Sequence, residues 1–263
     1  MKNTTQRNDP ARSLFLDCTE AVDSEFRFAF QPIIDWRDGR TIGHEALVRG
    51  RNGESAASVI SAIAPENALA FDQACRIRAL QTAADVGLIG DLHLNCSSIT
   101  PENVAAAVTA TREAAIRSGI DPKRVVLEFG NLELLGKPSE LDRAHSLASD
   151  AGFRVLADNV GSGEVGLKRL AVFRPNFAKL DRSLIRGIER SPRRQAIVLG
   201  IIATCQALGT EVIAAGVENA AEAAWLKRSG IEFAQGFHFG APRIRSGARR
   251  EQPRLLQAAL SLI

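Results

Sequence analysis

Residues 155–163 read VLADNVGSG, an apolar run that ends in an acid, an amide and two glycines. An apolar run bounded by turn-forming residues is typical of a buried strand. Seven further segments of the chain have this form, and segments with helical spacing separate most of them. The predicted strands are RFAFQPI, IGHEALV, LHLNC, RVVLEF, FRVLAD, NFAKLD, EVIAAG and EFAQGF.

Two of the intervening segments show the apolar spacing of a helix. The first has this spacing in residues 104–115. Thr100 and Pro101 are interpreted as its cap and first-turn proline, and Gly119 as its end. A second helix is expected over residues 197–208. Strands alternating with helices over about 240 residues favour an α/β fold, a (β/α)8 TIM-like barrel, with an open doubly wound sheet as the competing architecture. We expect residues 1–24 to form a lead with a short helix and residues 25–263 to form the barrel.

The composition is that of an ordinary globular protein. The chain has 263 residues, of which 45% are hydrophobic and 24% are charged, with a net charge of +3. No apolar run is long enough to span a membrane, and the first residues lack the apolar middle of a secretion signal, so a cytoplasmic location is expected. The basic residues are mostly scattered, which argues against direct nucleic acid binding. The cysteines form no Cys-x-x-Cys motif, so zinc is not indicated.

A polar side chain follows each predicted strand. A single one is most often a helix cap or a surface charge, but a complete series indicates a common site, because barrel enzymes assemble their chemistry at the carboxyl ends of the strands. The series is Gln31, Glu45, Asn95, Glu128, Asp158, Lys179, Glu218 and Gln235.

Four members of this series suggest a cation site. Glu45, Asn95, Glu128 and Asp158 offer three carboxylates and one amide, an all-oxygen set suited to Mg²⁺, Mn²⁺ or Ca²⁺ rather than zinc. Lys179 is a candidate to hold a phosphate or a nucleophilic water. The histidines show no metal-binding spacing, which favours structural roles for them.

A competing motif lies in residues 161–166, which satisfy the G-x-G-x-x-G pattern of dinucleotide-binding domains. Asp181 follows near the distance expected for a ribose-binding acid. That pattern normally follows the first strand of its domain, whereas here it follows the fifth. A dinucleotide cofactor is therefore disfavoured.

Residues 44–49, HEALVR, resemble the Glu-Ala-Leu signature of the EAL family of cyclic di-GMP phosphodiesterases. The segments FQPI, LNCS, LEF, LADN, KLD, AAGVE and QGFHFGAP follow in that family's order, from Phe26 to Pro242. The resemblance implies a (β/α)8 barrel with an antiparallel first strand, and opening of cyclic di-GMP to the linear dinucleotide with two divalent metals. The segment FDQACR, residues 71–76, resembles EAL domains attached to blue-light sensors.

Three positions depart from the family pattern, because Asn131, Asn159 and Ala215 stand where the family has acids. The resemblance assigns the first metal to Glu45, Asn95, Glu128 and Asp158, whereas the second metal shares Asp158 and relies on positions 159 and 215. It therefore implies that one Mg²⁺, Mn²⁺ or Ca²⁺ is kept and the second metal is lost. The remaining catalytic candidates, Lys179 and Glu218, are then expected to be insufficient for hydrolysis.

Nucleotide contacts are a separate matter from cleavage. By the resemblance, the nucleotide-contacting positions are Gln31, Glu45, Leu47, Arg49, Gln235 and Pro242. Arg49 can pair with a phosphate as a fork of donors or merely neutralise nearby acids. In the family the loop after Asp158, together with position 131, supports dimerisation, so homodimer formation is open.

Three functions remain as alternatives. A degenerate EAL domain can act as a cyclic di-GMP receptor, for which the retained Glu45 and Arg49 argue. It can be a surviving metal-dependent phosphodiesterase, against which Asn159 and Ala215 argue. It can also be a partner-binding regulator, for example of a transcription regulator, that binds no nucleotide. The expectation leans away from an enzyme.

Overall fold

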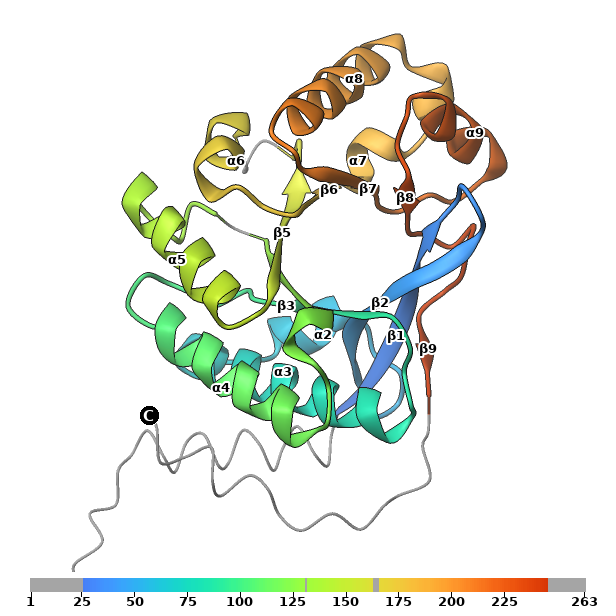
Figure 1. Ribbon diagram of the computed structural model, residues 1–263. Coiled ribbons are helices and arrows are strands. Elements are labelled where there is room, and N and C mark those ends of the chain that lie inside the picture. Colours follow the sequence, from blue (N-terminus) through green and yellow to red (C-terminus); the bar gives the residue numbers. More distant parts are fainter. Residues whose placement is uncertain (1–25, 131, 163–165, 246–263) are drawn as a thin grey trace, which may run out of the picture.

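The computed structural model describes residues 26–130, 132–162 and 166–245. The lead and short helix expected over residues 1–24 lie outside these residues, as does Asn131. Eight strands form a closed ring, which confirms the (β/α)8 barrel (Figure 1). The strands are β1 (Phe26–Asp35), β2 (Arg40–Gly50), β3 (Asp91–Asn95), β4 (Val125–Phe129), β5 (Arg154–Val160), β6 (Phe177–Leu180), β7 (Glu211–Ala214) and β8 (Phe233–Ala234).

The first strand runs against the others, as expected. Strands β2 to β8 pair in parallel in chain order, and β1 closes the ring by antiparallel pairing with both β2 and β8. A short strand β9 (Arg243–Ile244) pairs antiparallel with β1. Because parallel neighbours end on the same side, the carboxyl ends of β2 to β8 share one rim of the barrel.

Helices surround the ring (Figure 1). The expected helix α4 begins at Val104, three residues after Pro101, because Thr100 and Pro101 lie in a preceding turn. Among the described residues, no helix combines the length and the apolar character needed to cross a membrane. The α-helices are α2 (Ala56–Ser61), α3 (Ala68–Asp85), α4 (Val104–Arg117), α5 (Pro138–Asp150), α6 (Leu167–Phe173), α7 (Arg182–Ile185), α8 (Pro192–Ala207) and α9 (Ala220–Arg228), and the 3-10 turns are η1 (Pro65–Asn67), η2 (Pro122–Arg124) and η3 (Ile188–Arg190).

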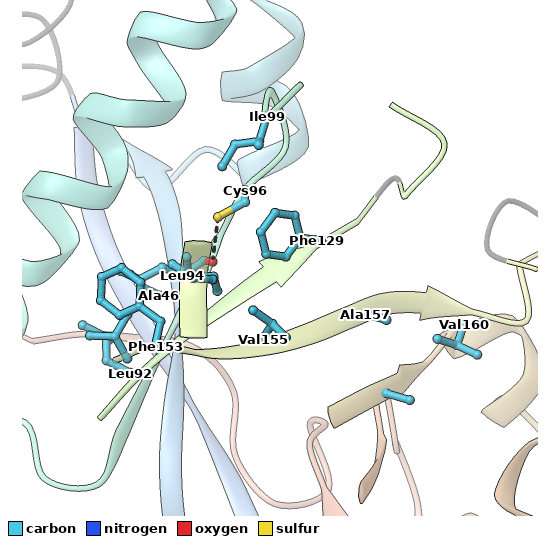
Figure 2. Packing of buried hydrophobic residues seen from close by; sticks show 14 of the residues in the cluster. Ala46, Leu92, Leu94, Cys96, Ile99, Phe129, Phe153, Val155, Ala157 and Val160 are labelled. Atoms are coloured by element: carbon cyan, nitrogen blue, oxygen red, sulfur yellow. Dashed lines mark hydrogen bonds between the residues drawn. The ribbon is translucent and has the colours of Figure 1, made fainter. Parts of the chain in front are cut away.

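Each strand has an outer face that packs on the helices. Successive side chains of a strand point to opposite faces, so residues two apart share a face. Leu92, Leu94 and Cys96 at β3 and Val155 and Ala157 of β5 belong to the large buried cluster outside the ring (Figure 2). Full burial of an aliphatic side chain contributes roughly 1.5–3 kcal/mol to folding.

The interior of the ring holds a second, smaller cluster. Its members come from six different strands, and each occupies an inward position of its strand. They are fully or almost fully buried and fill the half of the barrel away from the carboxyl rim. They are Ile33, Val126, Leu156, Phe177, Ile213 and Phe233.

The same alternation carries polar side chains to the rim. On a strand, the residue two positions after an inner apolar residue also faces inward. On β4, β5 and β6 and at the end of β8, this second inward residue is polar. On the antiparallel β1 the rim residue precedes its apolar neighbour. These polar inward positions are Gln31, Glu128, Asp158, Lys179 and Gln235.

Candidate functional site

Lys179 lies at the centre of the candidate site. Its ammonium contacts three carboxylates: Glu128 Oε2 at 2.6 Å, Glu45 Oε2 at 3.2 Å and Asp158 Oδ1 at 3.8 Å. These four side chains come from β6, β4, β2 and β5, and the Lys179 and Glu128 side chains are almost completely buried. The parallel strand ends therefore bring together four residues that are far apart in sequence.

Three amides complete the network around Glu45. Asn95 Nδ2 donates to Glu45 Oε1 at 3.2 Å, and Gln235 Nε2 donates to Glu45 Oε2 at 2.7 Å and to Gln31 Oε1 at 3.1 Å. Gln31 Nε2 in turn donates to the carbonyl of Gly240 at 3.1 Å. Seven of the eight predicted rim residues thus belong to one connected network of hydrogen bonds and ion pairs.

His93 is a member of the site that the sequence reasoning treated as structural. Its Nδ1 lies 2.9 Å from Glu128 Oε1, and its side chain is completely buried beside Phe177. Burial, followed by the charge of Lys179, lowers the pKa of His93 to about 3, so the ring is neutral. The signal was available: His93 precedes Asn95 by two residues and therefore faces inward beneath it.

The site holds more negative charge than Lys179 can balance. Burial and the neighbouring Glu45 raise the pKa of Glu128 to about 7, and burial raises the pKa of Asp158 to about 6 despite Lys179. Burial alone would raise the pKa of Glu45 too, but Lys179, Gln235 and Asn95 hold it below its usual value. The pKa of Lys179 is raised, since the three carboxylates outweigh its burial.

This surplus of negative charge fits a divalent cation. The available ligand atoms are carboxylate and amide oxygens, which suit Mg²⁺, Mn²⁺ or Ca²⁺. Within the described part of the chain, no three acidic, histidine or cysteine side chains are arranged to hold a metal as they stand. Lys179 lies among the carboxylates at contact distance, so a cation and this ammonium would compete for the same oxygens.

Asp158 and Asn159 sit in a bulge of β5. Ala157 pairs with Ala178 and Val160 with Leu180, so two residues of β5 oppose a single residue of β6. Asn159 has a positive φ of 56°, a left-handed conformation that asparagine adopts more readily than most residues. A Cβ built on Gly130 would lie 3.6 Å from Asn159 Nδ2, so the amide lies beside the end of β4. The bulge therefore breaks the regular alternation of faces at Asp158 and Asn159.

Strand β7 differs from its neighbours at the rim. Ala215 follows the inner residue Ile213 by two positions and is half-buried, so it continues the inward face without a polar group. Glu218 lies three residues further on and is exposed. Its Oε1 accepts from Arg186 Nη2 at 2.8 Å, and Glu218 is not among the carboxylates that contact Lys179.

The remaining predicted nucleotide contacts lie along one side of the rim. Leu47 lines a cavity of about 200 Å³ between β2, α2 and α3, which Glu45 and Asn95 also border. Arg49 is half-buried, and its Nη1 donates to the carbonyl of Val48 at 2.8 Å. Burial lowers the pKa of Arg49. Pro242 is half-buried immediately before β9.

The fold agrees with the comparisons with known proteins. The EAL domain family matches residues 17–242, so the chain belongs to the EAL domain family. It is 38% identical to a standalone versatile EAL protein from Vibrio cholerae O395 solved in a c-di-GMP bound form, with a TM-score of 0.77 and coverage of 84% of this chain and 93% of that chain.

Two further proteins are also similar. Klebsiella pneumoniae BlrP1, solved as a calcium and cyclic di-GMP complex, is 30% identical with a TM-score of 0.78 over 86% of this chain and 58% of that chain. The blue light- and temperature-regulated antirepressor BluF of Escherichia coli K12 is 30% identical over 82% of this chain, which spans 54% of BluF. The chain thus covers about half of this curated relative, and the expected likeness to blue-light EAL proteins is confirmed.

Proposed function

We propose that this EAL domain acts in cyclic di-GMP signalling as a cytoplasmic receptor that binds cyclic di-GMP with one divalent cation and hydrolyses little or none of it. The observation that carries the proposal is the inward rim position of β7, where Ala215 offers no ligand atom. Asn159, in the bulge beside Asp158, offers only an uncharged amide. A second cation placed there would lack two anionic ligands.

The cation of the proposal would be held by Glu45, Asn95, Glu128 and Asp158. When bound, it would supply a Lewis acid that stabilises negative charge on a phosphate. A two-metal hydrolase uses its second ion to share in stabilising the attacking and leaving oxygens. With one ion and Lys179, the site is suited to hold a phosphodiester rather than to cut it.

Nucleotide binding would use the amides and Arg49 next to this cation site. Gln31 and Gln235 are linked to each other and to Glu45, which fixes their orientation. Arg49 has no carboxylate partner within ion-pair distance among the described residues, so its fork of donors is available for a phosphate. Leu47 and Pro242 would provide apolar contacts to the ligand. The EAL structures from Vibrio cholerae and of BlrP1, both solved with this dinucleotide, support this assignment.

A second candidate function is regulation through a protein partner. The relative BluF is named an antirepressor, and it is 30% identical to this chain over 82% of the chain's residues. On this alternative the rim would persist without nucleotide binding, and a transcription regulator is the class of partner to seek.

The deciding experiment is calorimetric titration of cyclic di-GMP into the protein with Mg²⁺, Mn²⁺ or Ca²⁺, followed by analysis for linear dinucleotide. The receptor proposal expects binding without product. Glu45→Gln should weaken binding because it replaces an anionic ligand by a neutral amide, whose single oxygen can no longer accept from both Asn95 and Gln235. Product formation would make the protein an enzyme. If cyclic di-GMP does not bind in the presence of any of the three cations, the proposal is overturned and the partner-binding alternative is favoured.

A further inference from the structure

Arg76 of α3 is a completely buried cation outside the rim network. Its Nε donates to Thr111 Oγ1 of α4 at 3.3 Å, and its Nη2 donates to Gln73 Oε1 at 2.8 Å. Its Nη1 pairs with Asp72 and also donates to the backbone carbonyl of Asn95 at 3.3 Å. One guanidinium thus links α3 and α4 to the residue that ends β3.

Asp72 makes a second contact with the same segment. Its Oδ2 pairs with Arg76, and its Oδ1 accepts from the backbone N–H of Ser97 at 3.2 Å. The two main-chain bonds therefore hold the backbone on both sides of Cys96, at the carbonyl of Asn95 and at the amide of Ser97. This is the point where the Asn95 side chain must project toward Glu45.

We propose that Asp72 and Arg76 are positioning residues that fix the end of β3 so that the Asn95 amide is oriented for the cation site. This inference rests on the proposed function. Groups that orient metal ligands typically change metal affinity by about 10–100-fold when they are removed. Arg76 is suited to this role, since the three nitrogens of its rigid, planar guanidinium reach Thr111, Gln73, Asp72 and the Asn95 carbonyl at once, whereas a lysine offers a single nitrogen.

The test compares Arg76→Lys with Arg124→Lys as a matched control. Arg124 also binds main-chain carbonyls next to β3, donating to Leu88 at 2.7 Å and to Gly90 at 2.6 Å, but at the opposite end of that strand. A double variant, Asp72→Leu with Arg76→Leu, removes both charges together, so neither is left buried and unpaired.

The first readout is Mn²⁺ affinity without nucleotide, measured from the electron paramagnetic resonance signal of free Mn²⁺, at a temperature where circular dichroism shows each variant folded. We expect Arg76→Lys and the double variant to bind Mn²⁺ about tenfold or more weakly, while Arg124→Lys is unchanged. A merely structural role would lower stability in all three variants and leave the Mn²⁺ affinity of the folded state alone.

The second readout is hydrogen exchange of the backbone amides in residues 95–98, which does not depend on the cation. Exchange should be faster in Arg76→Lys and in the double variant than in Arg124→Lys. Unchanged affinity together with unchanged exchange, or equal losses in the control, would overturn the inference. If the native chain binds no Mn²⁺, the proposed cation site is wrong. The hydrogen exchange of residues 95–98 then decides by itself whether Asp72 and Arg76 fix the end of β3.

Discussion

The barrel rim has two sectors that share one scaffold and differ in charge. In the charged sector the ammonium of Lys179 lies among three carboxylates, of which Glu45 and Glu128 are buried and Asp158 is half-buried, and the Asn95 amide donates to Glu45. In the depleted sector, the bulge at Asn159 and the inward position of Ala215 present an amide and a methyl group. We name them by their members: the charged sector is Glu45, Asn95, Glu128, Asp158 and Lys179, and the depleted sector is Asn159, Ala215 and Glu218.

The difference shows that backbone geometry and chemistry are separable at this rim. Strand β5 contains a bulge at residues 158 and 159, and Asn159 has a positive φ there, although its side chain is uncharged. On β7 the ladder pairing with β6 is regular from Glu211 to Ala214, the residue before Ala215. The strand geometry at this rim is therefore compatible with an uncharged residue at position 159.

The largest effect is expected from Lys179→Met, which removes the only cation of the charged sector. Without divalent cations it should lower the free energy of unfolding by about 3–5 kcal/mol, because buried carboxylates are left uncompensated. Mn²⁺ should restore more stability to the variant than to the native chain. Thermal denaturation with and without Mn²⁺ measures both effects.

The control for this change is Lys227→Met, since Lys227 is an exposed lysine whose Nζ donates to the carbonyl of Trp36 at 2.9 Å. It should respond to Mn²⁺ as the native chain does. Equal stability of Lys179→Met and the native chain, or an equal response to Mn²⁺, would contradict the view that the charged sector is an anionic cation site.

The next effect tests the depleted sector by refilling it. Asn159→Asp together with Ala215→Glu should return two anionic ligands and raise hydrolysis of cyclic di-GMP by roughly a hundredfold, the order contributed by a well-placed catalytic group. Aspartate tolerates the left-handed conformation at position 159. Chromatographic detection of linear dinucleotide gives the rate.

Adding Glu45→Gln to this double variant is the matched control and should abolish the gain, because Glu45 belongs to the charged sector. A native rate equal to that of the refilled variant would show that the depleted sector does not limit catalysis.

The smallest effect is expected from Glu218→Gln. Glu218 pairs with Arg186 while 46% exposed, and an exposed pair of this kind contributes less than about 1 kcal/mol. Stability to urea should therefore change little, and calorimetric affinity for cyclic di-GMP should be that of the native chain. A marked loss of affinity would place Glu218 in the nucleotide site and redraw the boundary between the sectors.

Much of this fold could be predicted because its signals are local. The eight predicted strands correspond to β1 through β8. All the polar residues predicted at their ends except Glu218 lie in one network, since alternation along a strand and parallel pairing leave few alternatives. The start of α4 was placed three residues too early, because Thr100 and Pro101 form a turn that resembles a helix start.

The partners of three residues could not be predicted from sequence, because they depend on contacts between distant segments. Lys179 was predicted to serve a phosphate or a water, and the three carboxylates that surround it in the structure were not foreseen. His93 showed no metal-binding spacing, and Arg76 was noted only as the last residue of FDQACR. In the structure His93 contacts Glu128 and Arg76 bonds the carbonyl of Asn95. Such partners become visible only when the barrel closes.

The sequence by itself determined the strand pattern, the carboxylate and amide types at the rim and the absence of acids at positions 159 and 215, because these are properties of single segments. The tertiary structure alone decided which charges meet, how deeply they are buried and therefore how strongly their pKa values are displaced. The physical reason is that desolvation and electrostatic interaction depend on distance in space, which the closed ring of strands sets and the order of residues does not.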